Sequence, residues 1–257
     1  MSRYAVVTIV FVVLLAGSFA MQGIMTFPVM WYVAVIMLYL IISAYGSTVM
    51  SAQLFLPARC KASREKKAIA LTFDDGPIEG KTGKVLDILK QHGVPAAFFC
   101  IGNRVRDNRE LLQRIHSEGH LIGNHSYWHA STFDLLSASK VEKELADTDA
   151  AIESGVGVMP RFFRPPYGVT NPMIAKAVKK RNYTVIGWSV RSFDTITKDR
   201  AKLFSRVTRS LKGGDVILFH DYCDSTLDIL PDLLKHVADL GLKVVRVDEL
   251  LNEKAYG

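Results

Sequence analysis

The chain has 257 residues, of which 49% are hydrophobic and 22% are charged. This balance excludes a disordered or low-complexity protein and allows one domain of moderate size with an appendage. The net charge is +7, but Arg3 and residues 59–67 carry +5 of it. Because this basic excess flanks an apolar segment, we predict contact with membrane lipids and no binding to nucleic acid.

The first part of the chain is an apolar segment without a single charged side chain. Residues 4–58 contain no Asp, Glu, Lys, Arg or His. A helix that spans a bilayer needs about 20 residues, so we predict a membrane segment over 1–58 with a two-helix hairpin at about 4–21 and 24–44. The first stretch ends in small residues and also suits a cleavable signal peptide, in which case the second stretch would remain as a single anchor.

The side of the membrane on which the rest of the chain lies depends on the number of spans. With two spans, both basic flanks lie on one side and the uncharged turn lies on the other. The positive-inside rule then places the C-terminal part in the cytoplasm, most naturally at a bacterial inner membrane. With one span, it can face outward. We expect residues 59–67 to be a basic juxtamembrane linker and residues 68–257 to be the folded domain.

The three cysteines, Cys60, Cys100 and Cys223, are scattered and form no CxxC pair. We therefore expect free thiols and no disulfide framework. Cys100 lies within an apolar run and is expected to be a small core residue.

From residue 68 onward, short apolar runs alternate with amphipathic helical patterns. The runs predict strands at 68–73, 96–101, 121–123, 161–164, 183–190, 215–219 and 242–245. The helical patterns lie at 81–91, 109–117, 137–153, 171–180, 199–212 and 227–240, and most are followed by a glycine, which is a helix stop signal. This alternation predicts an α/β fold with a parallel sheet, open or closed into a barrel.

Polar residues gather where these predicted strands end. They are Asp74, Asp75, His125, Arg164, Asp194 and His220. The C-terminal ends of barrel strands meet at one face, so we expect these side chains to share a site. Each signal is weak alone, because paired aspartates before a glycine commonly form a turn and His-x3-His spacing, as in His125 and His129, arises by chance. Asp75 adds the third ligand of a metal site that keeps one open position.

Taken together, the motifs follow one another in a specific order. They are Thr72-Phe73-Asp74-Asp75-Gly76, His125-Ser126 with His129, Arg164-Pro165-Pro166-Tyr167-Gly168, Asp194, and Leu218 with His220. This set resembles the polysaccharide deacetylases, the NodB-homology or family-four carbohydrate esterase type, over about residues 68–250. The resemblance implies a distorted (β/α) barrel and a metal-dependent hydrolase. Such an enzyme removes N-acetyl or similar N-acyl groups from amino sugars of a glycan such as peptidoglycan or a chitin-like oligosaccharide.

The resemblance also implies a role for each motif residue. The ligands of one divalent ion are Asp75, His125 and His129. Asp74 is the general base, His220 the general acid, Asp194 the carboxylate that orients His220, and Arg164 the guanidinium that steadies the base. The backbone N–H of Tyr167 meets the oxyanion, and Leu218 lines the acetyl pocket. Zinc suits this ligand set, with cobalt, nickel and manganese as alternatives.

One motif departs from the family pattern. Where the family often has Asp-x-x-Asp-Trp, this chain has Arg191 in place of the first acid and Thr195 in place of the tryptophan. The substrate-side wall therefore cannot be transferred from any one relative. Two alternatives stay open: a deacylase of a lipid-linked amino sugar precursor at the membrane, and a catalytically silent, membrane-anchored glycan-binding protein. Tyr127 and Trp128 fit either core packing or stacking on a sugar ring.

Overall fold

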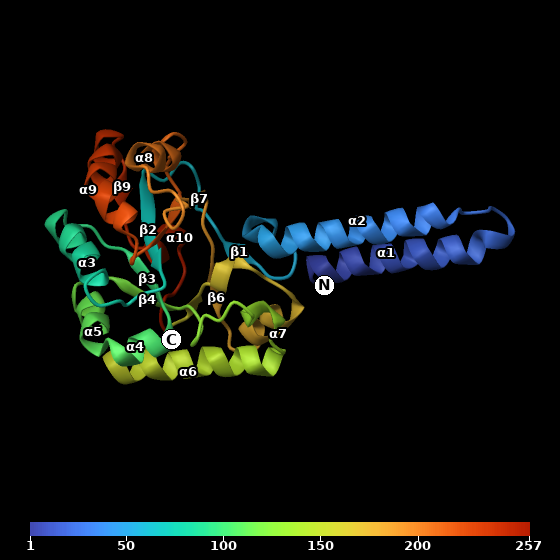
Figure 1. The fold of residues 1–257 in the computed structure, drawn as a ribbon, viewed down its shortest axis with the longest axis horizontal. Helices are drawn as coiled ribbons and strands as arrows, with labels where there is room; N and C mark the ends of the chain where they lie inside the picture. The colour runs from blue at the N-terminus through green and yellow to red at the C-terminus, as the bar shows by residue number, and fades with distance from the viewer.

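A computed structural model describes residues 1–257 and shows two long helices projecting from a globular α/β domain (Figure 1). Helices α1 (Arg3–Ala20) and α2 (Val29–Thr48) form a hairpin, and a short turn with η1 (Met21–Gly23) connects them. Both are long and apolar enough to cross a membrane by length and composition. The second helix starts five residues later than the start expected near residue 24, because Pro28 precedes its first turn and cannot continue a helix backward.

Polar side chains inside the hairpin pair with one another. The Tyr39 hydroxyl donates to the Tyr4 hydroxyl at 3.1 Å, and Trp31 Nε1 donates to Ser18 Oγ at 3.0 Å. Such pairing suits helices in an apolar solvent, where water cannot satisfy these groups.

The domain is built on nine strands, and every strand pair is parallel. They are β1 (Ala58–Arg59), β2 (Ala68–Asp74), β3 (Ala97–Cys100), β4 (Leu121–Asn124), β5 (Phe162–Phe163), β6 (Thr184–Ile186), β7 (Val190–Arg191), β8 (Val216–His220) and β9 (Lys243–Val244). Their order is β1-β6-β5-β4-β3-β2-β8-β7, with β9 beside β2. No hydrogen-bonded ladder joins β7 to β1 or β6, so the fold is the distorted (β/α) barrel that the family resemblance implies.

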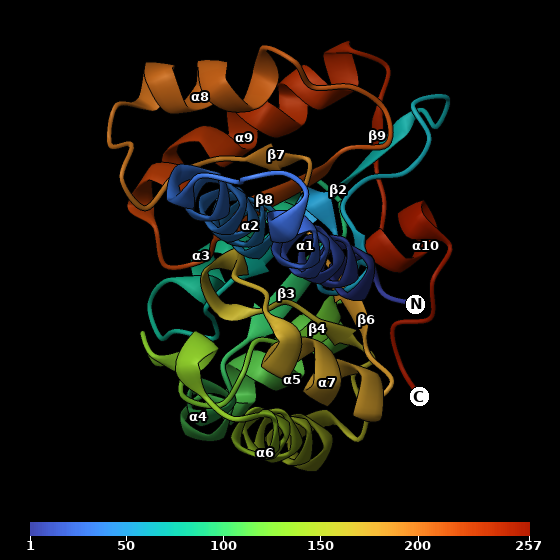
Figure 2. The ribbon, with the colours of Figure 1, turned by 90° about the vertical axis from the view of Figure 1, so that its right-hand side faces the viewer.

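Helices surround the sheet (Figure 2). They are α3 (Thr82–Gln91), α4 (Gly102–Asp107), α5 (Arg109–Ser117), α6 (Ala138–Val156), α7 (Pro172–Lys180), α8 (Arg200–Thr208), α9 (Asp224–Asp239) and α10 (Val247–Leu251), with short 3₁₀ turns η2 (Met50–Ala52), η3 (Phe133–Leu135) and η4 (Pro166–Gly168). In β2 the side chains of Ile69, Leu71 and Phe73 belong to the main apolar cluster with helices α3 and α9. The alternate residues of the same strand therefore face the barrel interior.

Three details differ from the sequence expectations. The single strand predicted at 183–190 is divided into β6 and β7, because Gly187 packs tightly against two sulfur atoms: a Cβ there would lie 2.5 Å from Cys60 Sγ and 2.7 Å from Met50 Sδ. The short helices α4 and α10 have no counterpart among the predicted helices. Residue 59, expected to begin a linker, instead ends strand β1, which pairs with β6.

The three cysteines are free and buried.

Candidate functional site

Two adjacent strands carry polar side chains to the same end of the barrel. Strands β2 and β8 pair so that Asp74 lies beside His220 and Thr72 lies beside Leu218. Because side chains alternate along a strand, Thr72 and Asp74 face inward while Phe73 between them packs outward into the core. The alternation therefore delivers a carboxylate and an imidazole to one mouth.

Three predicted metal ligands come together beside this pair. Asp75 Oδ1 lies 3.4 Å from His125 Nε2 and 3.3 Å from His129 Nε2, and the three candidate ligand atoms all lie within 4.8 Å of one another. Oδ1 of Asp75 is buried and has no hydrogen-bond partner within the protein. A buried carboxylate oxygen needs a partner, and one carboxylate with two imidazoles suits a divalent transition metal. The residues present therefore fit the metal that the family pattern implies.

The electrostatics of this cluster favour the forms that bind metal. Burial would raise the pKa of Asp75, but the adjacent His125 and His129 hold it below its ordinary value. Burial and the proximity of His125 lower the pKa of His129 to about 4. His125 Nδ1 lies 2.7 Å from the carbonyl oxygen of Arg164, which can only accept a hydrogen bond. Nδ1 therefore carries the proton, and Nε2 keeps its lone pair toward Asp75.

Arg164 lies fully buried inside the barrel beneath Asp74. Its Nη1 donates to Asp74 Oδ1 at 2.6 Å and to Thr72 Oγ1 at 2.9 Å. Its remaining nitrogens donate to the carbonyls of Ile186 at 2.9 Å and Gly187 at 3.1 Å. The Arg164 guanidinium therefore connects the Asp74 carboxylate to residues 186 and 187, where the chain passes from β6 to β7.

A second carboxylate supports His220 on the opposite wall. Asp194 is fully buried, and its Oδ2 accepts hydrogen bonds from the backbone N–H of His220 at 2.7 Å and from Thr226 Oγ1 at 2.6 Å. Its Oδ1 lies 2.8 Å from His220 Nδ1. Burial disfavours the protonated imidazole, but this hydrogen bond and the charge of Asp194 outweigh it, and the pKa of His220 is raised above its ordinary value.

These groups surround a pocket of about 220 Å³. Seven of the nine residues predicted from the sequence line it, namely Asp74, Asp75, His125, His129, Tyr167, Leu218 and His220. The other two, Arg164 and Asp194, lie behind the wall and act on it through Asp74 and His220. The structure thus brings every predicted site residue to one place.

Tyr167 adopts a backbone conformation that is uncommon outside glycine. Its φ is 59° and its ψ is 0°, within the turn η4 that follows Pro165. Its backbone N–H has no acceptor within the protein, while the N–H groups of Gly168 and Val169 both donate backward within the turn. A free donor on a left-handed residue at a pocket wall is a feature found at functional sites.

Asp221 is a site-adjacent residue to which the sequence reasoning gave no role. Its carboxylate is fully buried, and Oδ2 accepts a hydrogen bond from Thr82 Oγ1 at 2.7 Å. A Cβ on Gly76 would lie 1.9 Å from that oxygen, so only glycine fits after Asp75. Burial, together with the charges of Asp75 and Asp74, raises the pKa of Asp221 to about 7. In the sequence, only the position of Asp221 directly after His220 indicates that it lies near the site.

Comparisons with known proteins agree with this geometry. Residues 61–186 match the family model described as polysaccharide deacetylase. A peptidoglycan-N-acetylglucosamine deacetylase of Bacillus cereus is 35% identical over 194 residues, which cover 74% of this chain and 90% of that protein. This chain belongs to the polysaccharide deacetylase family.

Other members of the polysaccharide deacetylase family extend the comparison. The peptidoglycan-N-acetylglucosamine deacetylase of Listeria monocytogenes is 34% identical over 78% of this chain, which spans only 43% of that relative's length. A peptidoglycan N-acetylglucosamine deacetylase crystallised with a benzamide-based ligand superposes with a TM-score of 0.73 at 28% identity, over 76% of this chain and 93% of that chain. A family pseudoenzyme from Bacillus anthracis also superposes, with a TM-score of 0.70 at 29% identity over 76% of this chain and 69% of its own.

The wall of the pocket differs from the usual polysaccharide deacetylase pattern, as the sequence indicates. Arg191 and Thr195 both line the pocket. Aromatic surface is supplied instead by Trp188, together with Tyr167, Phe193 and Tyr222. The Trp188 ring packs so closely on Gly168 that a Cβ there would lie 2.4 Å from Trp188 Cη2. Trp188 belongs to the break between β6 and β7, which the sequence had not predicted.

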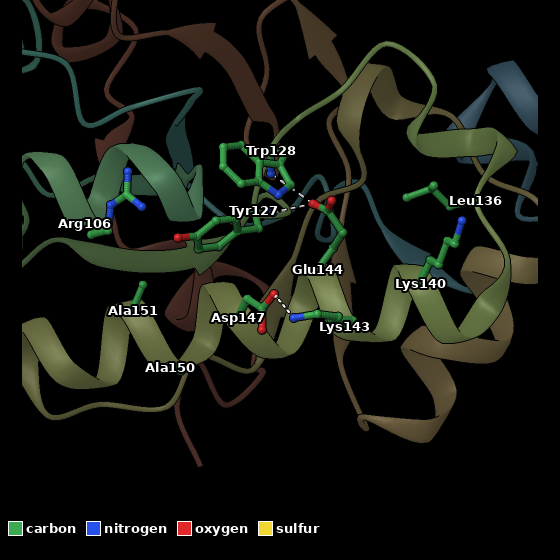
Figure 3. A pocket seen from close by; sticks show the side chains of 10 residues that line it. All are labelled: Arg106, Tyr127, Trp128, Leu136, Lys140, Lys143, Glu144, Asp147, Ala150 and Ala151. Atoms are coloured by element: carbon green, nitrogen blue, oxygen red, sulfur yellow. Dashed lines mark hydrogen bonds and ion pairs between the residues drawn. The ribbon is translucent and has the colours of Figure 1, made fainter.

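A larger, shallower hollow of about 660 Å³ lies outside the metal cluster, between α4, α6 and the segment that follows His125 (Figure 3). Glu144 Oε2 accepts hydrogen bonds at 2.9 Å from the backbone N–H groups of both Tyr127 and Trp128. The Trp128 residue is 58% exposed, so it is not a core residue. Phe162 and Phe163, by contrast, are buried in the barrel.

Proposed function

We propose that this protein is a metal-dependent N-deacetylase that removes N-acetyl groups from amino sugars of a glycan such as peptidoglycan or a chitin-like oligosaccharide. One observation carries this proposal. The Asp75, His125 and His129 cluster lies in the same pocket as a buried carboxylate, Asp74, and an imidazole held by a carboxylate, His220. A glycan-binding protein without activity has no need of an acid and a base around one pocket.

The two aspartates of the motif have different roles in this proposal. Asp75 would hold a divalent ion with His125 and His129, and such an ion lowers the pKa of a water molecule and polarises an amide carbonyl. Asp74 takes the proton from the attacking water. Its Oδ1 is already bonded to Arg164, which leaves Oδ2 as the basic oxygen, and that oxygen lies 3.8 Å from His125 Nε2 on the side of the cluster.

The remaining residues act on the developing charges and the leaving group. The free backbone N–H of Tyr167 stabilises the oxyanion of the tetrahedral intermediate. His220, whose raised pKa keeps it protonated to higher pH, donates a proton to the departing amine, because an amine leaves poorly unless it is protonated. Leu218 is 2% exposed and lines the pocket, where it suits the methyl of an acetyl group.

The membrane-anchoring role of the hairpin is part of the proposal. Each helix is about 30 Å long, which matches the hydrocarbon thickness of a bilayer. With both helices in the membrane, residues 59–257 lie on the same side as Arg3, and the charge pattern favours the cytoplasm. Cysteine accessibility at an exposed position in intact cells determines the side, and rapid labelling by an impermeant reagent would contradict a cytoplasmic domain.

The function is tested with the full chain in detergent. We expect one divalent ion per chain by elemental analysis, zinc by preference, and acetate release from N-acetylated oligosaccharides. Changing His125→Ala with His129→Ala should remove both the ion and the activity. His92→Ala is the matched control, since His92 is exposed and does not line the pocket that contains the cluster. A well-folded protein that binds no ion from zinc, cobalt, nickel or manganese solutions would overturn the proposal.

A further inference from the structure

An arginine at the wall of the pocket stacks on aromatic rings but has no side-chain hydrogen bond or ion pair within the protein. Arg191 ends strand β7, where it pairs in register with Leu218 of β8, and both line the pocket. Its guanidinium carbon lies 5.4 Å from the ring centre of Trp188 and 4.8 Å from that of Phe193. No hydrogen bond or ion pair joins it to a carboxylate, unlike Arg164, which binds Asp74.

This arrangement leaves the N–H groups of the Arg191 guanidinium free to bind an anion of a ligand. Stacking on aromatic rings restricts the guanidinium without using its N–H donors, which lie around the edge of the plane. Such an edge matches the oxygens of a carboxylate or phosphate in a bidentate manner. The pocket already contains two carboxylates, Asp74 and Asp75, and neither is bonded to Arg191.

We propose that Arg191 selects N-acyl amino sugars that carry an anionic group close to the acylated ring. This inference rests on the proposed deacetylase function and specifies its substrate class. The anion is a phosphate, as in a sugar joined through phosphate to a lipid, or a carboxylate, as in a sugar acid ether. Each can offer two oxygens to the paired N–H groups on one edge of a guanidinium.

The test compares charged and neutral substrates on the same metal-loaded, full-length enzyme. The neutral substrate is fully N-acetylated chitotetraose. The two anionic substrates are an N-acetylmuramic-acid-containing saccharide and N-acetylglucosamine linked through phosphate to a polyprenol in phosphatidylcholine vesicles. We expect Arg191→Gln to lower the ratio of kcat/KM for at least one anionic substrate over chitotetraose by tenfold or more, mainly through KM. The substrate that responds identifies the anion.

Arg206 supplies a matched control. Its guanidinium carbon also lies 4.8 Å from the Phe193 ring, but it does not line the pocket. Arg206→Gln should leave the ratio unchanged. A ratio that Arg191→Gln leaves unaltered for both anions would overturn the role of Arg191 while the deacetylase function stands. If the unaltered enzyme released acetate from none of the three substrates, the proposed function would fall and this inference with it.

A second inference rests on a different observation, the contact between the hairpin and the pocket loops. Thr170, which is 3% exposed, donates its backbone N–H to the carbonyl of Ser47 at 2.9 Å, and Ser47 Oγ donates back to the carbonyl of Thr170 at 2.8 Å. Thr170 is three residues beyond Tyr167 in the chain. The end of α2 is therefore bonded directly to the loop that forms one wall of the pocket.

The segment after α2 reaches a second wall. Met50 is 5% exposed and belongs to the apolar cluster that includes Phe133 and Ile174, and its sulfur packs against Gly187, next to Trp188. Leu54 in turn packs on Gly46 of α2, where a Cβ would lie 2.2 Å from Leu54 Cδ2. The hairpin is thus packed into the domain instead of being tethered to it by a free linker.

The geometry points to a pocket that is held at the membrane surface. This inference rests on the proposed anchoring by the hairpin. With both helices in the bilayer, the last turn of α2 marks its edge. Because that turn is hydrogen-bonded to Thr170, the wall that carries Tyr167 then lies within about 12 Å of the edge along the chain. The substrate is then a glycan carried on, or lying against, membrane lipid. A soluble enzyme on a flexible stalk has no such restriction.

Site-specific labels test this orientation on the full chain in vesicles. Leu135→Cys and Met173→Cys introduce thiols at positions that are 79% and 44% exposed. These positions lie on two segments near Thr170, and a hydrogen bond from Asn171 Nδ2 to the carbonyl of Asp134 joins the segments. The control position, Leu240, is 49% exposed and directly follows α9. Helix α9 lies at the far side of the domain from the hairpin (Figure 1). The native cysteines are buried and do not compete.

We expect a fluorophore at position 135 or 173 to be quenched at least threefold more by lipids with a nitroxide on the headgroup than a fluorophore at position 240. Equal quenching at all three positions, or stronger quenching at 240, would overturn the membrane-surface position. The readout is independent of activity, so it stands whether or not deacetylation is found.

Discussion

Nδ1 of His220 lies 2.8 Å from Oδ1 of Asp194, and the backbone N–H of His220 donates to the other oxygen of the same carboxylate at 2.7 Å. The carboxylate therefore fixes both the ring and the main chain of His220. Since Nδ1 donates to Asp194, the other nitrogen, Nε2, is the one that can give a proton to a substrate. Asp194 is thus a positioning residue whose charge also sets the proton affinity of His220.

Replacing Asp194 tests this electrostatic coupling. In the proposed mechanism His220 must be protonated, so activity is lost as the pH rises through its pKa. Asp194→Asn removes the charge that raises that pKa, so the pKa of His220 should fall and the alkaline limb of the pH–rate profile should move to lower pH with it. The imidazole resonances of His220 followed by NMR measure the shift directly. An alkaline limb that stays in place would show that another group controls it.

Asp74→Asn tests the general base. The amide keeps an oxygen that can accept from Arg164, so folding should be retained, but Oδ2 becomes an NH₂ group that cannot take a proton. General-base catalysis contributes about 10²–10⁴ in rate, and we expect kcat to fall by that factor with the bound ion still present. Acetate release and elemental analysis on the same sample distinguish the two effects. Unchanged turnover would discard this assignment.

Gly76→Ala tests the close approach of Asp221 to the motif. The new methyl would lie 1.9 Å from Asp221 Oδ2, in a fully buried place, so we expect destabilisation by about 1–3 kcal/mol or more. Gly83→Ala in α3 is the matched control, since its Cβ would meet nothing closer than Arg114 Nη1 at 3.6 Å and should stabilise the helix by up to about 1 kcal/mol. Urea unfolding measures both. Adding Asp221→Ala to Gly76→Ala should restore part of the loss.

The motif residues could be placed from the sequence because they follow strands. Asp74 lies after an apolar run, and His220 after another, and the ends of parallel strands meet at one mouth of a barrel. Which residues become neighbours there depends on the register between strands. The contact of Gly76 with Asp221 follows from Asp74 pairing with His220, and no sequence pattern reveals that register.

The position of Trp188 at the pocket wall could not be predicted from the sequence, for a different reason. An apolar run over 183–190 has the composition of one buried strand, and Trp188 within it fits a core position equally well. The division into β6 and β7 depends on the close packing of Gly187 against Met50 and Cys60, which come from the segment between α2 and β2. A contact between segments more than 100 residues apart leaves no local signal, so the sequence showed only that Thr195 had replaced the usual tryptophan.

Arg164→Lys tests whether a buried cation serves only as a charge beside Asp74. A lysine keeps the positive charge, but its single ammonium cannot also reach the carbonyls of Ile186 and Gly187, which the guanidinium holds at 2.9 and 3.1 Å. Those carbonyls would lie buried without a donor, so we expect a loss of about 2–4 kcal/mol in the free energy of unfolding. The wall at Trp188 follows Gly187, and KM should therefore rise as well.

Thermal unfolding with a surface control separates this effect from the general difference between arginine and lysine. Arg200→Lys alters an exposed ion pair with Asp232 and should change stability by less than about 1 kcal/mol. If Arg164→Lys is as mild as Arg200→Lys, the charge alone maintains Asp74 and the carbonyl bonds to the β6–β7 break contribute little. A large loss of stability with a raised KM would instead show that the Arg164 guanidinium positions both Asp74 and the pocket wall at Trp188.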